Sequence, residues 1–216
     1  KSILFLGMNL LCFSLVAQVY TFTSGEGEQS RTHTLLKDSN YLIETQYETN
    51  SRAFVSTRGG FYESKGDGFE VRFEFNSNYA KDSLKVMTFE ASEWKLSSLA
   101  KQEHTGQWLM AGRVRVEGEK RRNINGARKT LKFLLDGHFQ WTAYNTETFK
   151  FYGSGGGTYT ANNGTYVETI HYFSKDNTRV GAILPFQYDL KGPDWYHKGL
   201  NSKGLPMHEI WTQRKN

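Results

Sequence analysis

The chain has 216 residues, of which 15% are aromatic and 23% are charged, and its formal net charge at pH 7 is +5. This length suits one large all-β domain or two small ones, and the globular composition excludes disordered and collagen-like proteins. Because Lys and Arg alternate with Asp and Glu along most of the chain rather than gathering on one face, we expect no nucleic-acid partner.

Residues 1–17, KSILFLGMNLLCFSLVA, have the order of a secretory signal peptide: a Lys, an apolar run and a small residue. The run is shorter than the roughly 20 residues of a membrane-spanning helix, so we expect cleavage after Ala17 and no stable membrane insertion afterwards. The single cysteine, Cys12, lies in this segment, and the preceding Leu11 does not fit a bacterial lipobox. A mature chain without cysteine has no disulfide, thiolate nucleophile or zinc–thiolate site. We therefore expect an exported protein of the bacterial cell envelope, located in the periplasm or outside the cell.

Two parts of the remaining chain resemble each other. The segment 58–75, RGGFYESKGDGFEVRFEF, resembles 155–173, GGGTYTANNGTYVETIHYF, and the upstream segments 34–47 and 131–145 also match. The spacing of about 97 residues is too long for a solenoid repeat. It indicates a duplicated small domain or two halves of one large sheet.

Within each copy, apolar and polar residues alternate with a period of two, which is typical of antiparallel strands with one buried face. The inward faces predicted from this alternation are Phe69, Val71, Phe73 and Phe75; Tyr166, Glu168, Ile170 and Tyr172; Phe139, Trp141 and Ala143; and Leu131, Phe133 and Leu135. Closely spaced strands of this kind predict an all-β fold, either an antiparallel barrel or a sandwich.

Glycines mark the turns between these strands. Two-residue hairpin turns are predicted at Asp67-Gly68, Asp136-Gly137 and Asn163-Gly164. The glycine run at 153–158 lacks the Lys and the following helix of a phosphate-binding loop, so we expect it to form a bend or a bulge in a strand. Residues 94–104 are predicted to be a short helix or a linker between the two copies.

The second copy resembles a known family. Gly106-Gln107-Trp108 opens its first strand and Arg214 follows its last strand, a combination similar to the lipocalin pattern. The segment GGGTYTANNGTYVETI resembles the lipocalin-like domains of unassigned function that gut Gram-negative bacteria export. The resemblance covers 106–215 directly and 19–98 only through the repeat, where Val19-Tyr20-Thr21 replaces the G-x-W motif.

This resemblance implies an antiparallel up-and-down lipocalin-like β-barrel with an internal cavity, closed at one end by the pair Trp108 and Arg214. We therefore expect a signal peptide at 1–17, a first lipocalin-like repeat at 18–101 that is an incomplete barrel, and a better-formed barrel at 102–216. Such barrels bind small apolar or amphipathic molecules and do no chemistry, so we expect neither an enzyme nor a cofactor. Whether the copies form one barrel or two, the oligomeric state and the identity of the ligand stay open.

Glu168 is the most informative candidate for a site, because the alternation places a carboxylate inside the barrel. A buried carboxylate must be paired or hydrogen-bonded, so it is either a polar handle for a ligand or, as we favour, part of an internal pair with an Arg, Lys or Tyr. Trp195 and Tyr196 lie in the Gly- and Lys-rich segment 191–206, which is predicted to be a loop at the barrel mouth. The residues predicted to contact a ligand are Trp141, Tyr159, Glu168, Tyr172, Trp195, Tyr196 and Trp211.

Other chemistries receive less support from the sequence. The six histidines show no metal-ligand spacing, so no metal site is expected. A short basic cluster is interpreted as a solvated loop; it consists of Lys120, Arg121, Arg122, Arg128 and Lys129. Two alternatives remain: a carbohydrate- or protein-interaction module with surface aromatics and a packed interior, and a glycan hydrolase that uses the barrel carboxylates Glu168 and Glu209.

Overall fold

The computed structural model describes residues 18–90 and 94–215. The described chain is all-β apart from short helical turns, and its strands form two antiparallel sheets of seven and nine strands. The expected signal peptide and Cys12 lie outside the described residues. No helix in the described ranges has the length and apolarity needed to cross a bilayer.

The first sheet, here called the open sheet, has the strand order β6-β5-β4-β3-β2-β1-β7, so that β6 and β7 form its two edges. Its strands are β1 (Gln18–Ser24), β2 (Arg31–Lys37), β3 (Tyr41–Glu48), β4 (Phe54–Lys65), β5 (Gly68–Asn76), β6 (Val86–Glu90) and β7 (Lys95–Leu96). The single-turn helices η1 (Gly27–Gln29) and α1 (Tyr79–Asp82) lie in its connections.

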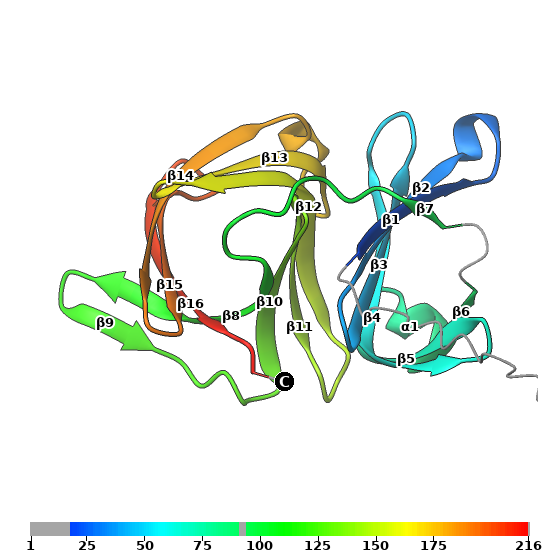
Figure 1. Ribbon diagram of the computed structural model, residues 1–216, viewed down its shortest axis with the longest axis horizontal. Helices are drawn as coiled ribbons and strands as arrows, with labels where there is room; N and C mark the ends of the chain where they lie inside the picture. The colour runs from blue at the N-terminus through cyan, green and yellow to red at the C-terminus, as the bar shows by residue number, and fades with distance from the viewer. Residues whose placement is uncertain (1–17, 91–93, 216) are drawn as a thin grey trace, which may run out of the picture.

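The second sheet closes into a barrel. Its strands are β8 (Gly106–Arg115), β9 (Gly118–Arg121), β10 (Arg128–Leu135), β11 (His138–Asn145), β12 (Phe151–Asn162), β13 (Thr165–Phe173), β14 (Ile183–Lys191), β15 (Asp194–Leu200) and β16 (Pro206–Gln213), with η2 (Asn177–Arg179) before β14. Consecutive strands from β10 to β16 pair as neighbours, β16 pairs with β8, and β8 pairs back with β10, which closes an eight-stranded antiparallel barrel. Strand β9 extends from β8 as a hairpin (Figure 1). The barrel prediction is confirmed for the second copy, whereas the first copy is an open sheet.

The predicted turn residues act as expected in two of the three hairpins. Asp136 and Gly137 have φ values of 44° and 75°, and Asn163 and Gly164 have 48° and 78°, which is the left-handed pair that a type I′ turn requires. In the β4–β5 hairpin, Gly68 pairs with Lys65, so the two turn residues lie one position earlier than predicted.

The two sheets repeat the same strand pattern at a constant offset of 97 residues. Tyr41–Glu48 corresponds to His138–Asn145, and Phe54–Lys65 corresponds to Phe151–Asn162. The irregularities in the ladders also recur, because bulges occur at Gly59/Gly60 and at Gly156/Gly157. The prediction that the glycine run forms a bulge is therefore confirmed.

The barrel wall packs against the open sheet (Figure 1). Leu131, Phe133 and Leu135 of β10 point out of the barrel and are buried with Tyr41 and Phe75, among other side chains of the open sheet. The prediction that these three leucine and phenylalanine side chains face the lumen is wrong. An alternation of two identifies the two faces of a strand, but β10 is buried on both faces, so apolarity does not tell which one faces the lumen.

The segment between the two sheets covers one end of the barrel. Its described residues, 94–105, contain the two-residue strand β7 and no helix, and they cross the barrel end in Figure 1. The backbone N–H of Leu99 donates to the carbonyl of Asp136 at 3.0 Å, and the Trp108 indole donates to the carbonyl of His104 at 2.7 Å. Residues 94–104, predicted to be a short helix or a linker, therefore form a linker, and this linker closes one end of the lumen.

Candidate functional site

The barrel contains a cavity of about 650 Å³. This volume lies within the range of about 300–1,000 Å³ that small-molecule sites occupy. Its buried lining includes Trp211, Ile170 and Phe186, and it also includes the polar side chains of Glu168 and His197. A small amphipathic molecule therefore has both apolar walls and fixed polar groups to contact inside the barrel.

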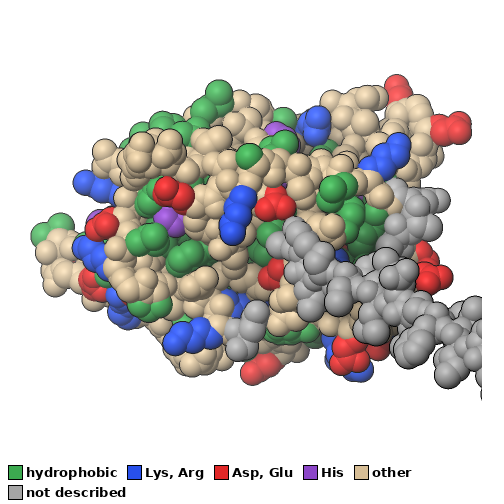
Figure 2. Space-filling view, viewed as in Figure 1, with side chains coloured by type: hydrophobic (Ala, Val, Ile, Leu, Met, Phe, Trp, Pro, Cys, Tyr) green, Lys and Arg blue, Asp and Glu red, His purple; other side chains and the backbone are tan. Residues whose placement is uncertain are grey.

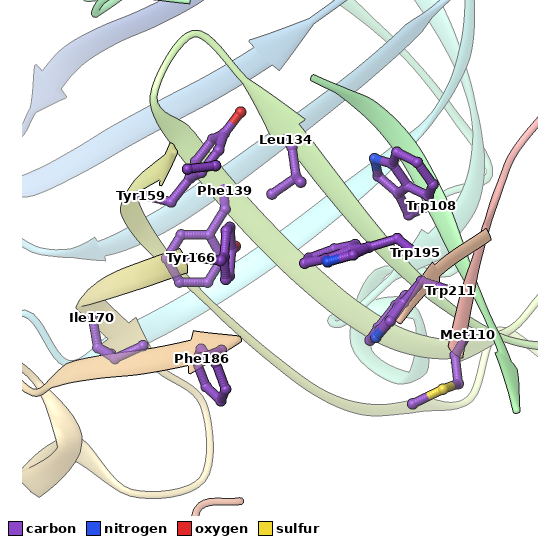
Figure 3. Close-up of a cluster of buried hydrophobic side chains, with 11 residues drawn as sticks. Trp108, Met110, Leu134, Phe139, Tyr159, Tyr166, Ile170, Phe186, Trp195 and Trp211 are labelled. Atoms are coloured by element: carbon purple, nitrogen blue, oxygen red, sulfur yellow. The ribbon is translucent and has the colours of Figure 1, made fainter. Parts of the chain in front are cut away.

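Aromatic side chains fill the closed end of the lumen below this cavity. Trp195 is fully buried between Trp108 and Trp211, with ring centroids 5.7 Å and 6.3 Å away (Figure 3). Tyr159 and Tyr166 belong to the same cluster. The interior is thus packed at one end and hollow at the other.

The prediction that Trp195 lies in a loop at the mouth is wrong. The segment 191–206 contains strand β15, and Lys191 pairs with Asp194 across a tight turn. The alternation of Trp195, Tyr196 and His197 was the signal for this strand: the first and third point inward, and Tyr196 points outward. The Tyr196 hydroxyl donates to Glu119 of β9 at 2.6 Å, outside the lumen.

Glu168 points into the barrel and forms an internal pair, as the favoured interpretation expected. The Lys132 ammonium donates to Glu168 Oε1 at 2.8 Å, and the Tyr166 hydroxyl donates to the same oxygen at 3.0 Å. The ammonium also lies 5.1–5.3 Å from the ring centroids of Tyr166, Trp195 and Trp211. Burial, with the charge of Glu168 second, raises the pKa of Tyr166 well above its ordinary value, so this tyrosine stays a donor. The pair is held from several sides and fixes β10 to β13.

His197 is a polar group of the cavity that the sequence reasoning did not single out. It is 1% exposed, and neither ring nitrogen has a hydrogen-bond partner within the described chain. Burial, followed by the charge of Lys132, holds the pKa of His197 well below its ordinary value of 6.5, so the ring is neutral. A neutral imidazole offers one donor and one acceptor, and leaving both unsatisfied costs free energy. A ligand atom in the cavity is one way to satisfy them.

Glu209 is a second lumen carboxyl. Arg113 donates to it at 3.3 Å, and the Trp211 indole donates to it at 3.3 Å. Burial raises its pKa above the ordinary value despite the nearby Lys132 and Arg113 charges.

Trp141 lines the open part of the cavity, and glycines make room for its ring. A Cβ on Gly155 would lie 2.8 Å from the Trp141 Nε1, and a Cβ on Gly153 would lie 3.5 Å from its Cη2. The glycine run of β12 therefore has two structural roles: it allows the bulge, and it leaves room for the large ring of Trp141 against the barrel wall.

Tyr172 does not face the lumen, contrary to the predicted alternation. The bulge at Gly156/Gly157 shifts the register of β13, so Phe173 lines the cavity and Tyr172 points toward the open sheet. There its ring stacks on Tyr47, with the centroids 5.5 Å apart. A bulge reverses the alternation beyond it, and its position could not be read from the polar pattern alone.

The expected closing pair of Trp108 and Arg214 is not formed. Trp108 points into the closed end of the lumen, whereas Arg214 points to the open sheet, where it binds both oxygens of Glu74 at 2.8 and 2.9 Å. Its guanidinium also lies over the rings of Tyr41 and Phe61. Arg214 therefore joins the two sheets rather than closing the barrel.

The basic cluster is not an isolated solvated loop. Lys120, Arg121, Arg122 and Arg128 all contribute to the lining of the cavity, while the Lys129 ammonium donates to the carbonyl of Ile124 at 3.0 Å. These residues are close together in the sequence, but no sequence pattern indicates that they surround the opening of a cavity.

Within the described residues, no group of three His, Cys, Asp or Glu side chains is arranged to hold a metal ion. No family model and no curated protein matches this chain.

Proposed function

We propose that the protein binds a small apolar or amphipathic molecule inside the barrel and carries out no chemistry on it. The observation that carries this proposal is the cavity of about 650 Å³, which has aromatic walls and is also lined by His197, an imidazole with no hydrogen-bond partner in the described part of the chain. Binding would remove apolar ligand surface from water, and the polar groups would orient the ligand. The resemblance of the second copy to lipocalin-like domains agrees with this role. An exported protein of the cell envelope remains our proposal for its location.

The hollow lumen favours this proposal over a surface-interaction module with a packed interior. The aromatic side chains of Trp141 and Phe173 are only half-buried, yet they line the cavity rather than an outer face of the barrel. The site therefore has the concave shape that small molecules need.

The arrangement of the carboxylates gives little support to a glycan hydrolase. A general acid or base must be free to exchange a proton with the substrate. Glu168 is held by Lys132 and Tyr166, and Glu209 by Arg113 and Trp211. These partners act as structural anchors for the two groups.

Native mass spectrometry of protein purified gently from its own host tests the proposal, together with titration of the neutral fluorophore N-phenyl-1-naphthylamine. We expect a bound small molecule or saturable binding of the fluorophore. Thr130→Trp, which places a large ring in the cavity lining, should weaken binding at least tenfold, a loss of about 1.4 kcal/mol. Thr160→Trp, on the exposed face of β12, is the matched control and should bind like the parent. No binding by the parent, or equal binding by both variants, would refute the proposal.

A further inference from the structure

The lining of the barrel cavity carries far more positive charge than the chain as a whole. It includes nine Lys or Arg side chains and two carboxylates, whereas the complete chain has a net charge of only +5. On the face shown in Figure 2, by contrast, Lys and Arg are interspersed with Asp and Glu. The excess of cations is therefore particular to the cavity.

Most of these cations lack a carboxylate partner. Lys132 pairs with Glu168 and Arg113 with Glu209, so both carboxylates of the lining are already neutralised. Arg121 pairs with two acidic residues, outside the lumen. The six remaining cations have no carboxylate oxygen within 4.0 Å in the described ranges, and we call them the cationic rim: Arg115, Lys120, Arg122, Arg128, Lys175 and Arg179.

The cationic rim lies at the open end of the barrel. Arg115 ends β8 and Arg128 begins β10, and both strands have their opposite ends at the lumen end that the linker covers. Lys175 and Arg179 lie in the connection between β13 and β14. The rim side chains are exposed or half-exposed, whereas Lys132, Glu168 and His197 are buried. The cavity therefore runs from a positively charged entrance to an aromatic floor.

The rim cations are close enough to repel one another. Burial, together with the positive charges of Arg128 and Arg113, lowers the pKa of Arg122. The guanidinium of Arg128 is held over the ring of Tyr152, 3.5 Å from its centroid, and Arg122 donates to the carbonyl of Arg128 at 2.9 Å. Like charges fixed at short range are unfavourable, and an anion placed between them would offset this cost.

We propose that the ligand is an anionic amphiphile, whose negatively charged headgroup lies on the cationic rim and whose apolar part enters the barrel. This inference rests on the proposed function and specifies its ligand class. A neutral lipid would leave the rim uncompensated, and a small inorganic anion would leave the apolar walls at Ile170, Phe186 and Trp211 empty. Nucleic acid fits less well because the cations surround a cavity entrance instead of forming a stripe along a surface.

Three probes with the same alkyl chain length test this inference: laurate, lauryl alcohol and laurylamine. Each probe is kept below its own critical micelle concentration, and its binding is measured by displacement of bound N-phenyl-1-naphthylamine. We expect laurate to bind at least tenfold more tightly than the alcohol and the amine to bind most weakly. The advantage of laurate should shrink as salt rises from about 10 mM to 1 M, because the Debye length falls from about 30 Å to 3 Å.

Charge-neutral variants locate the effect. The double variant Arg122→Gln/Arg128→Gln should reduce the preference for laurate over the alcohol to about threefold or less, because it removes two exposed cations that would each interact modestly with the headgroup. The control Lys81→Gln/Lys101→Gln removes the same charge at exposed positions outside the cavity lining and should keep the preference.

The possible outcomes separate this inference from the proposed function. Equal binding of laurate and the alcohol, or an unchanged preference in the rim variant, overturns the ligand class while ligand binding in the barrel stands. Displacement by inorganic phosphate as effective as displacement by laurate shows an anion site without a tail and also overturns it. Failure of all three probes in the parent, with Thr130→Trp indistinguishable from it, refutes the proposed function itself.

Discussion

The barrel and the open sheet share a strand pattern, but only one of them closes. Strands β2 to β6 match β10 to β14 in order and bulge position, so the shared segment does not decide the outcome. After β14 the chain adds β15 and β16, and β16 returns to β8. After β6 the described chain adds only β7, two residues paired with β1. Closing a barrel requires enough strands to bring the first and last together. The first and last of the seven strands in the open sheet do not pair, so β6 and β7 stay as its two edges.

The inner faces of the two copies carry different side chains at equivalent positions. The positions of Lys132 and Glu168 are occupied in the open sheet by Leu35 and Val71, which are both fully buried in an apolar cluster. A closed lumen can hold an ion pair surrounded by aromatic rings, whereas the open sheet buries hydrocarbon at the same two positions.

The outer faces meet through equivalent contacts. Tyr47 of the open sheet stacks on Tyr172 of the barrel, and in the exchanged positions Tyr144 packs on Phe75, with ring centroids 5.5 and 4.8 Å apart. The equivalent residues Phe54 and Phe151 stack on each other at 5.9 Å. The two copies thus associate as an isologous pair does, with the same surface used on both sides.

The largest expected effect comes from breaking the barrel's ion pair. Lys132→Leu or Glu168→Val alone leaves a buried unpaired charge and should lower the free energy of unfolding by about 3–5 kcal/mol. The double variant installs the residues of the open sheet and should be within about 1 kcal/mol of the parent. Chemical denaturation of the parent, the two single variants and the double variant measures this double-mutant cycle.

The double variant carries the decisive comparison. If it loses as much as the two single variants together, the pair is not replaceable by hydrocarbon. The barrel lumen would then differ from the inner face of the open sheet in more than its side chains.

A smaller and pH-dependent effect is expected between the two sheets. Burial would raise the pKa of Glu74, but its hydrogen bonds and charge interaction with Arg214, with Tyr41 and Tyr144 as further donors, hold that pKa below its ordinary value of 4.5. A depressed carboxyl pKa stabilises the fold above the pKa of the unfolded chain, and this stabilisation is lost as the pH falls through the folded pKa. Glu74→Gln should therefore cost about 2–3 kcal/mol at pH 7, and the loss should shrink steadily below pH 4.5.

Denaturation curves between pH 3 and 7 measure this loss. Glu70→Gln is the matched control, since Glu70 lies on the same strand and its ion-pair partners among the described residues are the exposed Lys65 and Arg72. A loss for Glu74→Gln that does not depend on pH would show that shape, not charge, joins the two sheets.

Much of the fold could be predicted from the sequence, because alternation and turn residues report local structure. The strands, the 97-residue offset and the inward position of Glu168 all follow from such signals. The face of β10, the orientation of Tyr172 and the partner of Arg214 depend on contacts between the two copies, which no single segment encodes. The cavity entrance could not be predicted for the same reason, since Arg128 and Arg179 line one cavity only in the closed barrel.

The smallest expected effect is a difference between two equivalent substitutions. A Cβ on Gly157 would lie 1.9 Å from the carbonyl oxygen of Thr169, and one on Gly60 would lie 1.8 Å from that of Arg72, so Ala must push the next strand away at both positions. In the open sheet, β5 is followed only by the edge strand β6 and can shift outward, whereas the barrel holds β13 through β14 and the closed ladder. Gly157→Ala should therefore cost about 1 kcal/mol more than Gly60→Ala, measured by hydrogen exchange in each sheet. Equal losses would mean that closure adds no rigidity to the shared strands.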